Sequence, residues 1–288
     1  MADEEHLHDR GLGFDVETLL GRRRALKLLA GAGLLALVGC GSDGKKSHGS
    51  ASTSTSASAS TTASTTAGSP GTTGPAAGCG TAIPEETGGP YPADGTNGPN
   101  VLKQSGILRS DIRSSFLAAT GTAQGVPLTI NLVILDASRK CAALTGAAVY
   151  VWHCNQDGLY SMYSRGVVNQ NYLRGVQTTD KEGRVSFRSI FPACYSGRWP
   201  HIHYEVYPTL SKATSASGKL ATSQMALPED ACRLVFATEG YSSSLANLSR
   251  VTLASDSVFG DGYSRELGTV AGGVAKGFTV ELSVPVSP

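Results

Sequence analysis

Hydrophobic residues in this chain occur in short runs that turn-forming residues separate. Such runs lie at residues 128–135, 147–153, 184–187, 202–207, 220–226, 250–253 and 278–284. Gly, Asp and Ser interrupt them, as in the Asp-Lys-Glu-Gly stretch at 180–183. Many short strands separated by turns are typical of an antiparallel sandwich or barrel. The pattern therefore predicts an all-β domain, an antiparallel β-sandwich with few short helices.

Helical patterning is sparse in the same region. One turn of helix is expected near residues 109–116 and a second near residues 243–247. Together with the strands, these segments define a domain over residues 79–288. That length is one that a single β-sandwich can fill.

The first 39 residues have the layout of an export signal. Arginines at 22–24 precede an apolar stretch at 28–39, and Cys40 follows. A basic region, a short apolar region and small residues before a break indicate a secretory signal. The paired arginines resemble a twin-arginine signal, and Leu-Val-Gly-Cys at 37–40 resembles a lipobox. We expect residues 1–39 to be removed and Cys40 to carry a lipid that anchors the protein at the outer face of the cytoplasmic membrane. A signal cut elsewhere would instead release the protein.

Residues 40–78 are expected to form a disordered linker. Of the 38 residues at 41–78, 34 are Ser, Thr, Ala, Gly or Pro, so the segment cannot bury enough apolar surface to offset its chain entropy. Its hydroxyl groups also permit O-glycosylation, which the sequence leaves open.

The whole chain has 24 Lys and Arg against 23 Asp and Glu, and this balance argues against a nucleic-acid partner.

Five cysteines fall within the predicted domain, at positions 79, 141, 154, 194 and 232. Export to an oxidising compartment allows disulfides, and an odd number leaves at least one thiol over. We expect one or two bridges, with the pairing open.

Side chains capable of metal chemistry gather around one predicted strand. His201 and His203 stand two residues apart on it, so their side chains project from the same face. Two imidazoles on one face make half of a metal site. Tyr195 and Arg198 precede the pair, and Tyr160 follows an Asp-Gly turn further upstream. A phenolate is a hard, strongly donating ligand that suits Fe(III) better than Fe(II) or zinc.

These residues lie in segments that resemble one enzyme family. Residues 84–91 read Pro-Glu-Glu-Thr-Gly-Gly-Pro-Tyr, residues 152–160 read Trp-x5-Gly-x-Tyr, and residues 192–203 end in Tyr-x-x-Arg-x-x-His-x-His. Residues 173–180 and the Thr-Ser-Gln stretch ending at Gln224 add to the likeness. The combination resembles the intradiol ring-cleavage dioxygenases, the family of protocatechuate 3,4-dioxygenase and catechol 1,2-dioxygenase.

The resemblance implies a β-sandwich of the intradiol type that holds non-haem Fe(III). The implied iron ligands are Tyr160, Tyr195, His201 and His203. Arg198 matches the position that stabilises charge on the bound substrate, and Gln224 matches a polar residue that lines the site. The implied reaction uses O2 to cleave a catechol-type ring between its two hydroxyl carbons, giving a muconate-type diacid. The Tyr195 phenolate would accept one of the two catechol protons.

The sequence also departs from the family pattern. Ala193 and Cys194 replace the usual Gly and aromatic residue before the second tyrosine, and Cys194 would be either disulfide-bonded or part of the pocket wall. The long N-terminal helical element of catechol 1,2-dioxygenases is missing. Met225 and Ala226 are smaller than the pair expected after Gln224. The identity of the catechol and the number of subunits therefore stay open.

Other function classes fit parts of the sequence. A non-catalytic exported β-sandwich that binds sugars or small aromatics could carry the motif by descent. A copper electron carrier would use His153 and Cys154 with the histidine pair, but it needs a short Cys-His-Met loop that Met162 and Met225 do not supply. A zinc hydrolase lacks a carboxylate at ligand spacing, and the tyrosines argue against Fe(II) extradiol cleavage. The interpretation that covers most of the chain is an exported intradiol dioxygenase.

Overall fold

The computed structural model describes residues 80–288. The predicted signal at 1–39 and the predicted linker at 40–78 lie outside these residues, as does Cys79. Within residues 80–288, none of the helices has the length and apolar character needed to cross a membrane.

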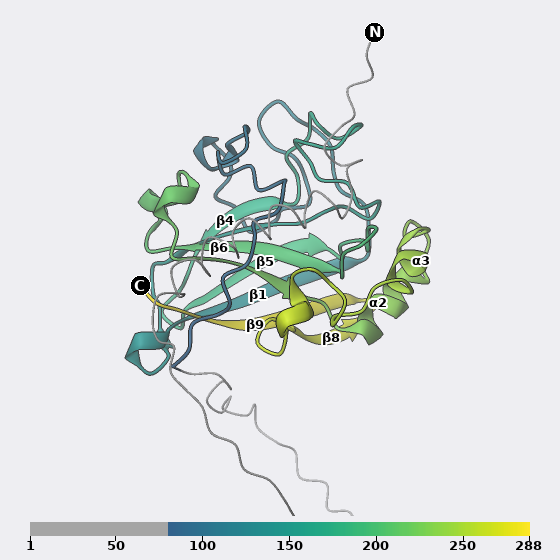
Figure 1. The fold of residues 1–288 in the computed structure, drawn as a ribbon. Helices are drawn as coiled ribbons and strands as arrows, with labels where there is room; N and C mark the ends of the chain where they lie inside the picture. The colour runs from purple at the N-terminus through teal and green to yellow at the C-terminus, as the bar shows by residue number, and fades with distance from the viewer. Residues whose placement is uncertain (1–79) are drawn as a thin grey trace, which may run out of the picture.

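Two β-sheets form the body of the domain (Figure 1). The first sheet has the order β2-β1-β9-β8, with β5 also paired to β1. Its strands are β1 (Pro127–Asp136), β2 (Ala142–Ala143), β5 (Arg184–Ile190), β8 (Thr269–Gly273) and β9 (Gly277–Val286). Strands β1 and β9 run parallel and the other pairs are antiparallel. Buried and less buried positions alternate along β1, so one face of this sheet packs on the core.

The second sheet is antiparallel throughout and has the order β4-β3-β6-β7. Its strands are β3 (Ala148–Trp152), β4 (Arg174–Thr178), β6 (His201–Tyr207) and β7 (Ala221–Ala226). Every residue of β3, β6 and β7 is buried. One face of these strands packs on the first sheet, and loops cover the other face. The predicted sandwich is confirmed, with one parallel strand pair in it.

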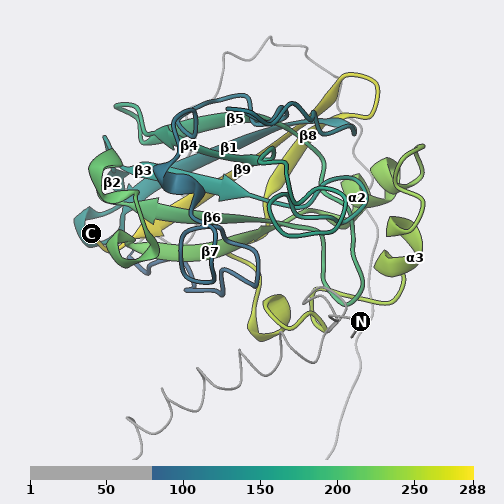
Figure 2. The same ribbon diagram turned by 90° about the horizontal axis from the view of Figure 1, so that it is seen from above.

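Short helices lie at one end of the sheets, and the C-terminus lies at the other end in both views (Figures 1 and 2). They are α2 (Glu229–Phe236) and α3 (Ser244–Leu248), the second of which confirms the expected turn near 243–247. Single 3-10 turns occur at Val101–Lys103, Ala137–Arg139, Leu210–Lys212, Ala216–Gly218 and Phe259–Asp261. Helix α2 buries Ala231, Cys232, Val235 and Phe236, and these positions recur with helical spacing on one face.

Two of the predicted elements are wrong. Residues 250–253 form no strand, because Thr252 and Ser255 close a turn there, with the Ser255 N–H donating to the Thr252 carbonyl at 3.1 Å. Residues 109–116 form no helix. The N–H of Arg109 donates to Val176 and that of Ile112 donates to Arg188, so this segment runs extended beside β4 and β5. Its backbone donors are used by the strands and cannot form helical bonds.

Candidate active site

The two histidines project from β6 on the face that points away from the core between the sheets. Ile202 and Tyr204, which alternate with them, belong to that core. The Nε2 atoms of His201 and His203 lie 3.1 Å apart. The alternation of a strand thus brings the two imidazoles together, as the sequence predicts.

The first tyrosine is placed by a tight turn after β3. The Asn155 side chain accepts the N–H groups of Asp157 and Leu159 at 3.0 and 2.9 Å and so shapes this turn. Beyond it, the Tyr160 hydroxyl oxygen lies 3.3 Å from the Nε2 atom of His203. The same oxygen lies 3.5 Å from the Nε2 atom of His201.

The second tyrosine approaches from the loop before β6. Its hydroxyl oxygen lies 3.3 Å from the Nε2 atom of His201. This loop passes so close to the first one that a Cβ atom at Gly158 would lie 3.1 Å from the Cβ atom of Tyr195. Gly158 also has a φ of +81°, which side chains disfavour. A glycine at this position therefore lets both tyrosines reach the histidine pair.

Four donor atoms with neighbouring separations of 3.1 to 3.5 Å are suited to a metal ion. A metal bound about 2.0–2.2 Å from each donor leaves neighbouring donors about 3 Å apart. The His201 Nδ1 atom lies 2.5 Å from the carbonyl oxygen of Trp199, a contact that fixes the ring and directs Nε2 to the cluster. Within residues 80–288, no three or more His, Cys, Asp and Glu side chains form a metal-binding group. The tyrosines are therefore needed to complete a set of donors.

Burial controls the protonation of these groups. It lowers the pKa of His201 to about 3, so the imidazole is neutral, which is the form that binds metals. Burial also raises the pKa of Tyr160 well above its ordinary value, and the neighbouring Tyr195 adds to this. A metal cation would reverse that effect, because it favours the phenolate. Neutral imidazoles beside two phenols form a donor set of nitrogen and hard oxygen, which fits ferric iron.

Arg198 and Gln224 lie together beside this cluster. The Arg198 Nη2 atom donates to the Gln224 side-chain oxygen at 2.7 Å, and both side chains are buried. The Gln224 amide donates in turn to the Thr87 carbonyl at 2.8 Å. Gln224 stands opposite His203 in the register of β6 and β7. The structure thus brings all six residues singled out in the sequence to one place.

Other residues at the site did not stand out in the sequence. The Trp152 ring stacks on His203 with 4.9 Å between centroids and 3° between planes. The Tyr91 ring packs 4.9 Å from that of Tyr160. The Asp256 carboxylate accepts from Arg198. Trp152 and Tyr91 lie within the family-like segments, whereas no local pattern marks Asp256.

The described cysteines fall into two kinds. Cys141 is disulfide-bonded, while Cys154, Cys194 and Cys232 are buried free thiols. Cys194 therefore belongs to the wall beside Tyr195, where its thiol contacts the Arg198 carbonyl at 3.4 Å. The Cys154 thiol contacts the Ala193 carbonyl at 3.7 Å.

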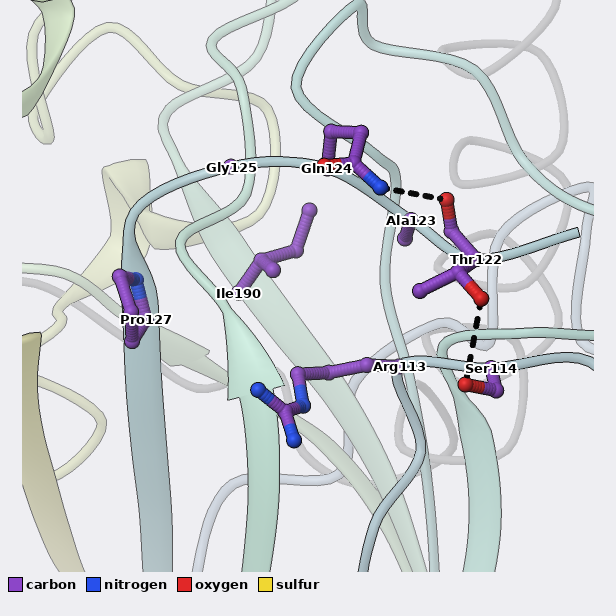
Figure 3. A pocket seen from close by; sticks show the side chains of 8 residues that line it. All are labelled: Arg113, Ser114, Thr122, Ala123, Gln124, Gly125, Pro127 and Ile190. Carbon is purple, nitrogen blue, oxygen red and sulfur yellow. Dashed lines mark hydrogen bonds between the residues drawn. The ribbon is translucent and has the colours of Figure 1, made fainter.

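A separate pocket of about 280 Å³ lies elsewhere on the domain (Figure 3). It is lined by Arg113, Ser114, Thr122, Ala123, Gln124, Gly125, Pro127 and Ile190. The sequence-predicted site residues are absent from this lining. Its hydrogen bonds, from Gln124 to Thr122 and between Ser114 and Thr122, serve the loop itself.

Known proteins resemble this chain in sequence and in fold. Residues 97–214 match the sequence model of the family described as dioxygenase. A chlorocatechol 1,2-dioxygenase from Rhodococcus opacus is 40% identical over 52 residues, covering 18% of this chain and 20% of that protein. A hydroxyquinol 1,2-dioxygenase from Rhizobium sp. (strain MTP-10005) is 28% identical over 137 residues, covering 37% of this chain and 45% of that protein. The chain thus matches less than half the length of these relatives.

The fold itself has a longer match. The structure of an intradiol ring-cleavage dioxygenase from Tetranychus urticae superposes with a TM-score of 0.57 at 22% identity, covering 72% of this chain and 95% of that one. The family match at 97–214 spans both tyrosines, Arg198 and both histidines. Residues 97–214 therefore resemble the dioxygenase family, and the fold of the domain is that of the intradiol ring-cleavage dioxygenases.

Proposed function

We propose that this protein is a ferric, non-haem intradiol dioxygenase that cleaves a catechol-type ring with O2 between its two hydroxyl carbons. The observation that carries the proposal is the convergence of four donor atoms beside a buried arginine. Tyr160, Tyr195, His201 and His203 would hold the iron. When bound, ferric iron would withdraw electron density from a chelated catechol and open it to O2, and the product would be a muconate-type diacid.

The protein's own residues have distinct tasks in this proposal. Tyr160 is 2% exposed, so its place is fixed by packing, whereas Tyr195 is only half-buried. The Tyr195 oxygen is therefore the better placed of the two to accept a proton from an incoming catechol hydroxyl. Arg198 provides a positive charge for the anion that develops on the substrate. Gln224 holds the guanidinium from one side.

The substrate class follows from the relatives and from the donor set. The related proteins are named for chlorocatechol and hydroxyquinol, and both names denote aromatic rings with neighbouring hydroxyl groups. A ring of this kind offers two oxygens that can bind one metal ion together. We therefore propose a catechol as the substrate class, with O2 as the second substrate.

We also propose that the domain acts outside the cytoplasm. The sequence of residues 1–40 supports this, because it combines paired arginines, a short apolar stretch and a cysteine after small residues. A lipid on Cys40 would hold the domain at the outer face of the cytoplasmic membrane.

The colour and product of the purified protein test the proposed activity. Tyrosinate bound to Fe(III) absorbs visible light, so the iron-loaded chain is expected to be reddish. Incubation with catechol in air should consume one O2 for each ring and yield a muconate-type diacid, measured by oxygen electrode and mass spectrometry. A colourless protein that binds no iron and only binds aromatics would establish the non-catalytic alternative instead.

A further inference from the structure

Arg198 is a buried cation whose guanidinium is held from two sides. Its side chain is 4% exposed, and that of its ionic partner Asp256 is fully buried. The Nε atom donates to Asp256 at 3.0 Å, and Nη2 donates to Gln224 at 2.7 Å. The remaining nitrogen, Nη1, makes no hydrogen bond within residues 80–288.

Asp256 is itself fixed by the main chain around it. Its Oδ1 atom accepts the N–H groups of Val258 at 2.8 Å and Phe259 at 3.1 Å. Its Oδ2 atom accepts the N–H of Trp199 at 2.6 Å. Burial alone would raise the pKa of Asp256, but the Arg198 charge and these N–H donors outweigh it and hold the pKa below its usual value. The carboxylate is thus a rigid anion with its acceptor sites in use.

The same carboxylate reaches the histidine pair through the backbone. Trp199 donates its N–H to Asp256, and its carbonyl contacts Nδ1 of His201 at 2.5 Å. The Phe259 ring, close behind Asp256 in the chain, lies edge-on to the His201 ring at 6.4 Å between centroids. Asp256 therefore orders the peptide between the arginine and the first histidine as well as the guanidinium.

We propose that Asp256 is a positioning residue for the ring-cleavage reaction: it fixes the Arg198 guanidinium so that Nη1 stays available to the negative charge that develops on the substrate. This inference rests on the proposed function. A cation that is already in place when charge develops costs no reorganisation during the reaction. A supporting group that fixes the side chain in contact with substrate is what such a site requires.

The test is a double-mutant cycle on iron-loaded full-length protein. Arg198→Gln should lower kcat for catechol by about 10²- to 10³-fold, as the loss of one charge-stabilising donor does in other enzymes. Asp256→Asn should retain iron and lower kcat at least about tenfold, because it removes the charge paired with Arg198 and replaces one of two oxygens that accept N–H groups by an amide nitrogen. The double variant should be no slower than Arg198→Gln alone, since Asp256 acts through that arginine.

Asp136→Asn is the matched control. Asp136 is 5% exposed and accepts the N–H of Ser138 at 2.9 Å at the start of a 3-10 turn, but within residues 80–288 it forms no salt bridge with an arginine. The Asp136→Asn variant should leave kcat for catechol unchanged. If Asp256→Asn does not fold, Asp256→Glu replaces it in the cycle, because the longer carboxylate keeps the charge and displaces the guanidinium.

The outcomes separate this inference from the proposed function. Full activity of the folded Asp256 variant, or losses that multiply in the double variant, would overturn the positioning role. A wild-type protein that cleaves no catechol would overturn the proposed function instead. In that case a crystal structure of Asp256→Asn decides the inference: loss of the bond from Arg198 to Gln224 supports it, and an unmoved guanidinium contradicts it.

Discussion

A single hydroxyl oxygen distinguishes Tyr160 from a phenylalanine that would fill the same space. The Tyr160→Phe substitution keeps the ring packing against Tyr91 and removes one of the four converging donors. We expect iron content to fall, or the visible band to shift, in Tyr160→Phe and in His203→Ala. Metal analysis and absorption spectra measure both.

Tyr172→Phe is the control for this prediction. Tyr172 is 5% exposed, and its hydroxyl faces Asn155 at 3.5 Å instead of the histidines. The Tyr172→Phe variant should keep both its iron and its colour. Full iron occupancy with an unchanged spectrum in Tyr160→Phe and His203→Ala would mean that these residues are not ligands.

A second residue-scale prediction concerns a buried acid away from the donor cluster. Glu266 is fully buried, with one oxygen accepting from Ser223 at 3.1 Å and the other without a partner within residues 80–288. Burial, reinforced by the charge of Glu86, raises its pKa from 4.5 to about 8. The folded protein therefore favours the protonated acid. The contribution of the protonated Glu266 side chain to the free energy of unfolding is complete below pH 4.5 and is lost as the pH rises toward 8.

Glu266→Gln should show this dependence, because the amide imitates the protonated acid at every pH. Relative to the wild type, we expect the variant to gain about 1–3 kcal/mol of unfolding free energy at pH 8 and almost nothing at pH 4.5. Denaturant melts at the two pH values measure it. Glu281→Gln on the surface is the control and should show no such trend. An equal effect of Glu266→Gln at both pH values would refute the assignment.

At the scale of elements, one arginine connects the segment 84–94 to the second sheet, in addition to the bond from Gln224 to Thr87. Arg174 on β4 is 1% exposed. It donates to the carbonyls of Tyr91 and Pro92 at 2.9 and 3.1 Å. It also donates to the Ser161 carbonyl at 2.9 Å, directly after Tyr160. One side chain therefore joins the segment that covers the site to the loop that carries a proposed ligand.

Arg174→Met should loosen both of these connections. It removes the Arg174 donor from the carbonyls of Tyr91, Pro92 and Ser161, so we expect a loss of about 2–4 kcal/mol in unfolding free energy. Amide hydrogen exchange should speed up in segment 84–94 before the rest of the domain. Arg184→Met, which removes an exposed ion pair with Glu281, is the control and should change neither quantity. Uniform exchange across the domain would contradict the proposed local role.

The elements show where sequence patterns are informative and where they are not. Strands such as β1 and β6 were predictable because apolar residues mark them. Strand β4, with the sequence Arg-Gly-Val-Gln-Thr, was not predicted, because its first residue, Arg174, is a buried cation that binds the carbonyls described above and does not resemble a strand residue of the core. Strand β8 escaped because Gly272 and Gly273 dilute its pattern. Helix α2 was missed because only one of its faces is apolar over eight residues.

The same contrast holds for the site. The histidine pair was predictable from strand alternation, and the family-like motifs marked the tyrosines, Arg198 and Gln224. Asp256 was not predictable, because its meaning comes from a loop that reaches Arg198 from a distant part of the sequence. Local patterns record a residue's neighbours along the chain, whereas such a contact exists only after folding.

At the scale of the whole molecule, export and metal loading bear on each other. Outside the cytoplasm, imidazole donors would meet copper and zinc, which bind nitrogen ligands more tightly than iron does. A cell avoids this competition if the domain folds and takes up iron before transport. The twin-arginine route carries folded proteins, so the proposed signal at Arg22 and Arg23 and the proposed iron site support each other.

Substitution of both arginines tests this link. Arg22→Lys with Arg23→Lys should leave the precursor in the cytoplasm, folded and loaded with iron, because the charge is kept while the paired arginines are lost. Cys40→Ala should instead permit transport and prevent lipid attachment, since it removes the only proposed acylation site. Cell fractionation with metal analysis of each fraction measures both. If the double-lysine variant reaches the outer face normally, the signal is of the general secretory type, and iron would then have to be acquired after transport against copper and zinc.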